Sequence, residues 1–181
     1  MAQRPVKIKF VRDPHARAVN SYTHVMRTRL IHSIRGPFNT ETSQFSFSDF
    51  LDWLTTIRLD FANPHFGLQR IPLESKLFRF DHVIKIEAPQ ERISYINQRD
   101  QLELRVPDAL FSSRHHLDRS STESSFCGDI PYGELGITAE GKNAPPYAAF
   151  YNRDLAQTVG ALYKDDIDLY DYQDSLDQIL G

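Results

Sequence analysis

The chain has 181 residues, of which 40% are hydrophobic and 25% charged, a composition that predicts one soluble globular domain with a hydrophobic core. No apolar run reaches the roughly 20 residues needed to cross a bilayer and no signal-peptide pattern opens the sequence, so we expect a cytoplasmic protein without a membrane span. Cys127 is the only cysteine, which excludes an internal disulfide and favours a reducing compartment.

Charge is distributed unevenly along the chain. Residues 1–35 hold eight Lys or Arg against Asp13 alone, a net of +7, whereas residues 151–181 hold two against seven Asp, a net of −5. The whole chain carries −3, so it is an acidic protein with one basic end. That distribution predicts local anion binding rather than the broad basic face of a nucleic-acid-binding protein.

The first expected elements are a strand and a helix joined by Arg12, Asp13 and Pro14. Apolar residues alternate with lysines over 6–10, which is the period of a strand. Asp13 suits a helix N-cap and Pro14 suits the first helical position, where the missing N–H is tolerated. Apolar spacing predicts that this helix continues to Ile34, before Gly36 and Pro37 end it.

Polar side chains gather around the start of that helix. Arg12 follows the strand, Arg17 lies one turn into the helix, and Asn20 and Ser21 lie nearly one turn further. Helix N–H groups and the helix dipole also favour an anion there, so a phosphate-bearing ligand is expected. Arg17 has an alternative, an ion pair with Asp13 one turn earlier on the helix surface.

The middle of the chain predicts a second helix and a second strand. Ser46 and Asp49 have the spacing of a capping box, which opens a helix over 47–58. Residues 59–76 have no clear period and are expected to form a loop. The β-branched run within 78–87 predicts a strand.

The second half of the chain predicts two more helices around a long irregular segment. Pro89 opens a helix that extends to about Leu104. Residues 106–146 are rich in Ser, Gly and Pro and are expected to form a long functional loop or lid. Asn152 can cap a helix that extends through Tyr170. The fold class is therefore α/β, with few strands for a single domain over 1–181.

Five segments together resemble the sulfotransferase family, specifically its carbohydrate-sulfotransferase branch with bacterial relatives. RDPHARAVNSY at 12–22 is similar to the family's Arg-Asp-Pro motif and the helix after it, with Asn20 in place of the usual Ser. The other four occur in the family's order and are FSFSDFLDWL at 45–54, NPHFGLQ at 63–69, FDHVIKIE at 80–87 and LYKDDIDLYDY at 162–172. Five such segments in the right order are hard to obtain by chance.

The resemblance implies a function and a set of ligands. Members of the family transfer sulfuryl from 3′-phosphoadenosine-5′-phosphosulfate (PAPS) to a hydroxyl acceptor, usually on a glycan. It implies that Arg12 binds the 3′-phosphate of PAPS, with Asn20 at the second phosphate-binding position. The neighbouring Ser21 is the alternative to Asn20 in that role, and Arg17 is a further candidate.

One part of the family pattern is missing from this sequence. The family binds the 5′-phosphosulfate with a P-loop-like strand–turn–helix upstream of Arg-Asp-Pro, but only ten residues precede Val11 and no GxxxxGK[ST] occurs. We therefore expect an incomplete P-loop-type sulfotransferase fold with impaired activity, either a fragment or a degenerate relative. The alternative is a non-catalytic binding module whose exposed sheet edge pairs with a partner or with itself.

Sulfuryl transfer also needs a base for the acceptor hydroxyl, and Glu87 and His65 are the candidates. Regular alternation would place Lys85 on the same face as Glu87, so an ion pair is the structural alternative for both. His115 and His116 lack the spacing of a metal site. The Asp-rich run over 165–177 is expected to be a solvated helix face and tail rather than a cation site.

Overall fold

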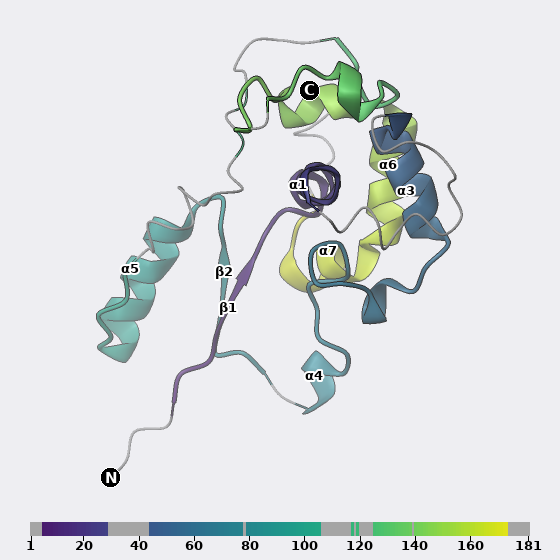
Figure 1. The fold of residues 1–181 in the computed structure, drawn as a ribbon. Coiled ribbons are helices and arrows are strands. Elements are labelled where there is room, and N and C mark those ends of the chain that lie inside the picture. The colour runs from purple at the N-terminus through teal and green to yellow at the C-terminus, as the bar shows by residue number, and fades with distance from the viewer. Residues whose placement is uncertain are drawn as a thin grey trace.

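The computed structural model describes residues 5–28, 44–77, 79–105, 117, 119, 125–138 and 140–173. Its two strands, β1 (Ile8–Val11) and β2 (His82–Lys85), pair in parallel, with Val11 opposite Lys85. The α-helices are α1 (Pro14–Arg27), α3 (Phe47–Thr55), α4 (Glu74–Leu77), α5 (Pro89–Asp100), α6 (Arg153–Leu162) and α7 (Lys164–Tyr170), shown in Figure 1. Short 3-10 helices occupy Leu59–Phe61, Tyr132–Glu134 and Tyr147–Phe150. The expected α/β class is confirmed at this level.

The strand pair lies between two helices, α5 on one face and α7 on the other (Figure 1). Ile84 packs with Ile93 and Ile96 of α5, all three at most 5% exposed. Val11 packs with Tyr170 and Tyr172 on the opposite face. Alternate residues of a strand point to opposite faces, so each strand contributes to both clusters. The inward placement of Ile93 and Ile96 agrees with the apolar pattern of the sequence.

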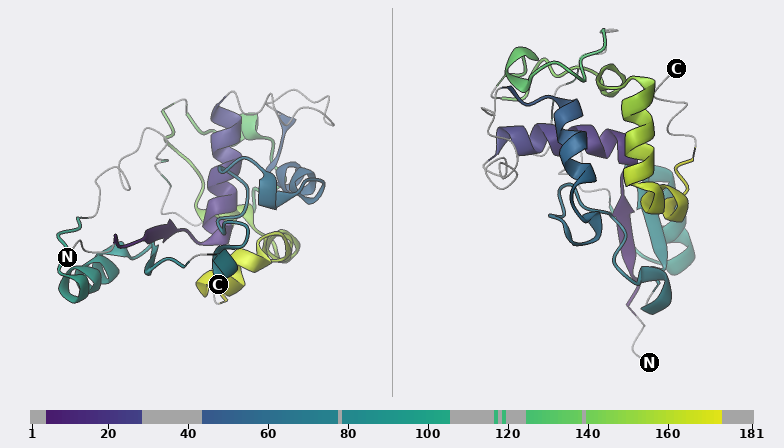
Figure 2. Two further views of the ribbon diagram at one scale, coloured as in Figure 1. Left: turned by 90° about the horizontal axis from the view of Figure 1, so that it is seen from below. Right: turned by 90° about the vertical axis from the view of Figure 1, so that its right-hand side faces the viewer.

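A larger core joins α1, α3 and α6 on the other side of the molecule (Figure 2). Aromatic rings dominate it: the Tyr22 ring lies 5.7 Å from that of Phe47 and 5.8 Å from that of Phe50, centroid to centroid. Tyr22 is fully buried and its hydroxyl donates to the carbonyl of Phe45 at 2.8 Å. The first helix therefore spans both parts of the fold, with its N-terminus at the sheet and its middle in the aromatic core.

The helix starts agree with the sequence better than the helix ends do. Both hydrogen bonds of the capping box at Ser46 are present, and Asn152 accepts from the Leu155 N–H at 2.8 Å. The prediction that the first helix continues to Ile34 is wrong, because Thr28 is already extended, with φ −120° and ψ 172°. The helix from Pro89 likewise ends at Asp100, because Gln101 is left-handed, with φ 54°.

The predicted single helix over 152–170 is two helices, divided at Tyr163. The Tyr163 side chain is fully buried and its hydroxyl donates to the Phe66 carbonyl at 2.7 Å. Downstream of it the inward side chains are Asp166 and Tyr170, whereas Leu169 is 44% exposed. The register of the apolar face changes at Tyr163, so the expectation of one continuous helix through Tyr170 is wrong beyond α6.

Two predicted irregular segments have different outcomes. The loop expected over 59–76 contains the short helices at Leu59–Phe61 and Glu74–Leu77. Of the loop or lid expected over 106–146, residues 106–116, 118, 120–124 and 139 lie outside the described residues. Of its described part, Arg119 forms an isolated parallel bridge with Ala144.

Candidate functional site

A cleft of about 600 Å³ opens where the two strands end and α1 begins. One side of α1 forms its long wall, and residues 64, 65 and 69 form the facing wall. Arg12, Arg17, Asn20, Ser21, His65 and Glu87 all line it. The structure thus brings together the six residues named as candidates from the sequence, although they come from three separate segments.

The main chain of Arg12 is fixed by the side chain of Gln69. The Arg12 N–H donates to Gln69 Oε1 and the Arg12 carbonyl accepts from Gln69 Nε2, both at 2.8 Å. The half-buried guanidinium of Arg12 makes no hydrogen bond or ion pair with any residue that the structure describes. The main chain of Arg12 is therefore fixed, while its guanidinium is available to a ligand in the cleft.

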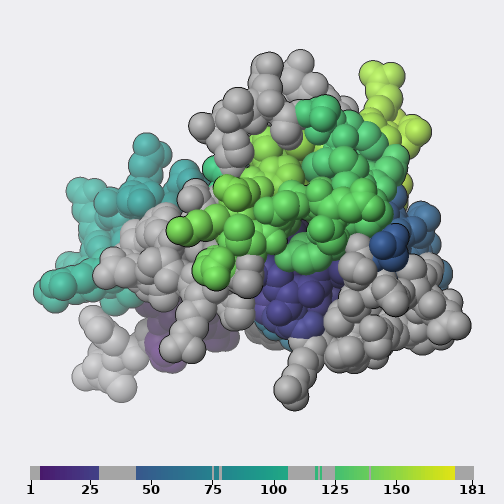
Figure 3. Space-filling view, turned by 45° about the horizontal axis from the view of Figure 1, so that its top comes forward, coloured from purple at the N-terminus to yellow at the C-terminus, as the bar shows by residue number. Residues whose placement is uncertain are grey.

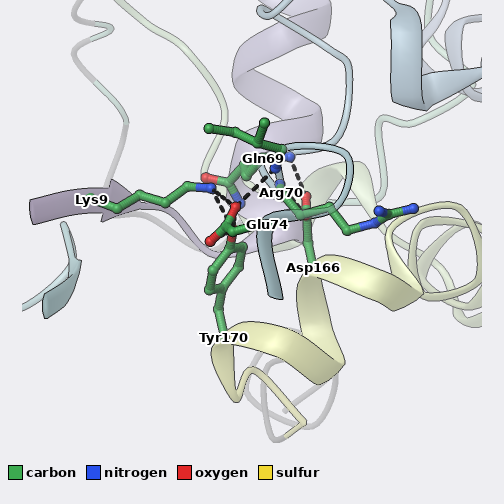
Figure 4. Close-up of polar contacts among 7 residues, drawn as sticks. Lys9, Gln69, Arg70, Glu74, Asp166 and Tyr170 are labelled. Carbon is green, nitrogen blue, oxygen red and sulfur yellow. Dashed lines mark hydrogen bonds and ion pairs between the residues drawn. The ribbon is translucent and has the colours of Figure 1, made fainter. Parts of the chain in front are cut away.

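A buried polar network holds Gln69 in turn (Figure 4). The Asp166 carboxylate accepts from the main-chain N–H groups of Gln69 and Arg70 at 2.7 and 2.8 Å. Burial raises the pKa of Asp166 despite these two hydrogen bonds. The expectation of a solvated face is therefore wrong for Asp166, whose position in α7 turns it toward the 69–70 main chain.

The same network buries a lysine of β1. Lys9 Nζ lies 2.5 Å from Glu74 Oε2 and 2.6 Å from the Tyr170 hydroxyl (Figure 4). The Lys9 and Glu74 side chains are only 10% and 9% exposed, whereas the apolar Phe10 is 42% exposed. The sequence pattern of apolar residues alternating with lysines is present, but its lysine at position 9 points inward.

The N-terminus of α1 is closed by its own cap. Asp13 Oδ1 accepts from the Ala16 N–H at 2.8 Å, while Asp13 Oδ2 is buried with no hydrogen-bond partner. This cap, rather than an external anion, satisfies the helix N–H group of Ala16. The cationic character of the cleft therefore comes from side chains along α1 more than from free N–H groups of its first turn.

Arg17 is held by the opposite wall and not by Asp13. Its Nη2 donates to the Pro64 carbonyl at 2.8 Å, and its guanidinium carbon lies 5.8 Å from the centre of the Tyr163 ring. The alternative of an Arg17–Asp13 ion pair is wrong, because Asp13 turns back onto its own helix. Arg17 Nη1 is buried with no partner among the described residues, and burial lowers the pKa of the guanidinium. An unpaired buried donor in the wall of a cleft fits an anionic ligand.

Asn20 and Ser21 are both engaged within the protein. Asn20 Nδ2 donates to the Tyr147 hydroxyl at 2.9 Å, and Asn20 Oδ1 accepts from Arg119 Nη2 at 3.0 Å. The Ser21 hydroxyl is 2.8 Å from the Arg17 carbonyl and 2.5 Å from the His65 carbonyl. Its single hydrogen is thus committed to the main chain.

The two candidate bases differ in their hydrogen bonds. Glu87 accepts from the Asp13 N–H at 2.7 Å and from the Tyr172 hydroxyl at 3.0 Å. The His65 ring is exposed and stacks on the His24 ring, with centroids 4.1 Å apart and planes at 24°. The Lys85–Glu87 ion pair is absent from the described residues, because β2 ends at Lys85 and the strand alternation stops there. Lys85 instead donates to the Asp171 carbonyl.

Charge in the cleft is predominantly positive. Among the described lining residues, Arg12, Arg17 and Arg27 face one carboxylate, that of Glu87. Arg17 and Arg27 share one face of α1 with Asn20 and His24, a spacing that is present in the sequence. Arg119 and Tyr147 had no such signal, because they come from a segment without a regular period.

Other classes of site find no support in the described part of the chain. No group of three His, Cys, Asp or Glu side chains is placed there to hold a metal ion. The pair His115 and His116 lies outside the described residues. No described helix is both long enough and apolar enough to cross a membrane.

The fold is of the α/β class, with parallel strands and a helix on each face of the strand pair. Its cationic cleft lies at the carboxyl ends of the strands, where α/β proteins commonly bind ligands. The sequence model of the Sulfotransferase family matches residues 1–173. The chain therefore belongs to the sulfotransferase family. No curated protein and no solved structure matches it significantly.

Proposed function

We propose that the chain acts in sulfuryl transfer from PAPS to a hydroxyl acceptor, and that its cleft binds the 3′-phosphate of the nucleotide. Family membership supports sulfuryl transfer in general terms. The observation that carries the specific proposal is Arg12, whose guanidinium is uncommitted at the end of β1 while Gln69 fixes its main chain. A guanidinium suits a phosphate because its N–H groups can donate two parallel hydrogen bonds.

The cleft fits such a ligand in charge and in hydrogen-bonding capacity. Arg17 Nη1 is a buried donor without a partner, and a phosphate oxygen would satisfy it. PAPS would supply the sulfuryl group as an activated donor, and the residues of this chain would bind and orient its 3′-phosphate. The loops after β1 and β2 contain no glycine, so neither offers a glycine-rich cradle for the 5′-phosphosulfate. The proposal concerns the 3′-phosphate half of the site.

Titration calorimetry with adenosine 3′,5′-bisphosphate tests this binding directly. We expect measurable heat from the wild-type chain and a large loss of affinity in Arg12→Ala. Arg153→Ala is the matched control, because Arg153 is an exposed arginine outside the cleft. A folded wild-type sample that gives no heat at millimolar ligand would overturn the proposal.

Within the cleft we assign proton acceptance from the acceptor hydroxyl to His65 rather than to Glu87. Both oxygens of Glu87 already accept structural hydrogen bonds, which tie the Asp13 main chain and Tyr172 together. The His65 ring, by contrast, is exposed at the cleft wall. A glycan hydroxyl is the proposed acceptor class, on the basis of the family branch that the sequence resembles.

Transfer of radiolabelled sulfuryl from PAPS to a panel of glycans separates the two candidates. His65→Asn should abolish the pH dependence of transfer that reflects the base, while nucleotide affinity stays unchanged. Glu87→Gln should keep that pH dependence. The assignment fails if Glu87→Gln removes the pH dependence and His65→Asn leaves it intact.

A further inference from the structure

Arg119 reaches the wall of the cleft from a distant part of the sequence. Its Nη2 donates to Asn20 Oδ1 at 3.0 Å and its Nη1 donates to the Pro145 carbonyl at 2.7 Å. The guanidinium carbon lies 3.9 Å from the centre of the Tyr147 ring, within the range of a cation–π contact. In Figure 3 the described residues from 125 onward (green) lie against the surface of α1 (purple).

All of these partners are neutral. Arg119 forms no ion pair with a carboxylate that the structure describes, and neither do Arg12 and Arg17. Burial lowers the pKa of Arg119, and the positive charge of Arg12 lowers it further. Half-buried guanidiniums that repel one another and form no ion pair lower the stability of the fold. A bound anion would offset that cost.

Asn20 and Tyr147 connect Arg119 to the cleft. Both line it, and the Tyr147 hydroxyl lies within hydrogen-bond distance of both Asn20 side-chain atoms, at 2.9 and 3.1 Å. The side-chain carbonyl oxygen of Asn20 therefore accepts from Arg119, and its amide nitrogen donates to Tyr147. A serine at this position would be too short to accept from the same guanidinium in this arrangement.

We propose that Arg119 is a positioning residue for the phosphate monoester in the cleft, and that it acts on the ligand through Asn20, which lines the cleft, rather than by direct contact. This inference rests on the proposed function, because it concerns the same 3′-phosphate. Arg12 and Arg17 line the cleft without an ion pair to a described carboxylate and favour a dianion over a monoanion, and Arg119 adds a third positive charge beside them. Asn20, Tyr147 and the Pro145 carbonyl fix the third guanidinium in place.

The test is a double-mutant cycle on the affinity for adenosine 3′,5′-bisphosphate. Arg119→Ala should weaken binding by about 10-fold, because Asn20 loses the hydrogen bond that orients it. Asn20→Ala should also weaken binding, and Arg119→Ala should have no further effect in the Asn20→Ala background. Arg119→Lys keeps the positive charge but lacks the paired N–H groups of the guanidinium. It should therefore bind with intermediate affinity, and the salt dependence of its binding should be closer to that of the wild type than that of Arg119→Ala is.

The outcomes separate this inference from the proposed function. If Arg12→Ala weakens binding but Arg119→Ala does not, the function stands and the role of Arg119 is refuted. Additive losses from Asn20→Ala and Arg119→Ala would refute an action of Arg119 through Asn20. If the wild-type chain binds no bisphosphate, both proposals fall together. Arg153→Ala controls for the loss of one positive charge, and thermal unfolding of each variant controls for the fold.

Discussion

The arginines of the cleft differ in how they are held, and that difference sets their expected roles. Arg17 and Arg119 each donate to a main-chain carbonyl, of Pro64 and Pro145 respectively. Within the described part of the chain, Arg12 is fixed through its main chain alone, by Gln69. Two guanidiniums are therefore placed before a ligand arrives, whereas the Arg12 guanidinium can reorient to meet one. Preplaced groups lose less conformational freedom on binding.

The single thiol offers a prediction that does not depend on the ligand. Cys127 is 6% exposed, and burial raises its pKa to about 11. Only the thiolate reacts, so labelling by a disulfide reagent at pH 8 should be at least ~100-fold slower in the native protein than in urea. The native rate should rise as the pH approaches 11. Equal rates in native and unfolded samples would show that the thiol is accessible.

The positions of individual site residues could be predicted from the sequence where those residues belong to a local motif. Arg12 and Asp13 stand at a strand–helix junction that the sequence shows directly, and both lie there in the structure. The partners of Asn20 were not predictable, because Arg119 is 99 residues away in a segment with no period. The alternation that suggested a Lys85–Glu87 pair failed because it assumed that the strand extends to residue 87.

The helices illustrate the different reliability of start and stop signals. Side-chain caps are local, so the sequence predicts them well: Ser46 and Asp49 form both hydrogen bonds of the box. Helix ends depend on tertiary contacts, as Tyr163 shows. Its buried hydroxyl bonds the Phe66 carbonyl across 97 residues, and the chain divides there into α6 and α7. No local pattern marks that division.

Removal of the cap of α3 should have a measurable cost. Ser46→Ala loses the acceptor for the Asp49 N–H at 3.1 Å, in a segment that buries Phe47 and Phe50 in the aromatic core. We expect the free energy of unfolding to fall by about 1 kcal/mol in urea titrations. Ser94→Ala, at an exposed position within α5, is the matched control and should change it little. A neutral Ser46→Ala would show that the cap contributes nothing to stability.

At the scale of the molecule, one polar network connects segments far apart in the sequence. Glu74 joins Lys9 of β1 to Tyr170 of α7, while Asp166 of α7 holds the main chain of Gln69 beside it (Figure 4). Since Gln69 in turn fixes Arg12, the network links the acidic end of the chain to the basic cleft. The sequence showed the charge asymmetry of the two ends but not that they are joined.

The Lys9–Glu74 pair should be strongly coupled in stability. Glu74→Ala leaves a buried lysine without its carboxylate and should cost about 3 kcal/mol of unfolding free energy. The double variant Lys9→Met, Glu74→Leu removes both charges and should recover most of that loss. Denaturant titrations of the single variants Lys9→Met and Glu74→Leu and of the double variant measure the coupling. Additive losses would mean that the two side chains do not interact.

The central claim is that the Arg12 guanidinium binds the 3′-phosphate of the nucleotide. The most direct measurement is a cycle that removes the phosphate from the ligand and the guanidinium from the protein. Calorimetric affinities are needed for adenosine 3′,5′-bisphosphate and adenosine 5′-monophosphate, each with wild-type protein and with Arg12→Ala. We predict that the bisphosphate binds the wild type more tightly by about tenfold or more, and that Arg12→Ala removes most of this preference. A preference that survives Arg12→Ala unchanged would contradict the account.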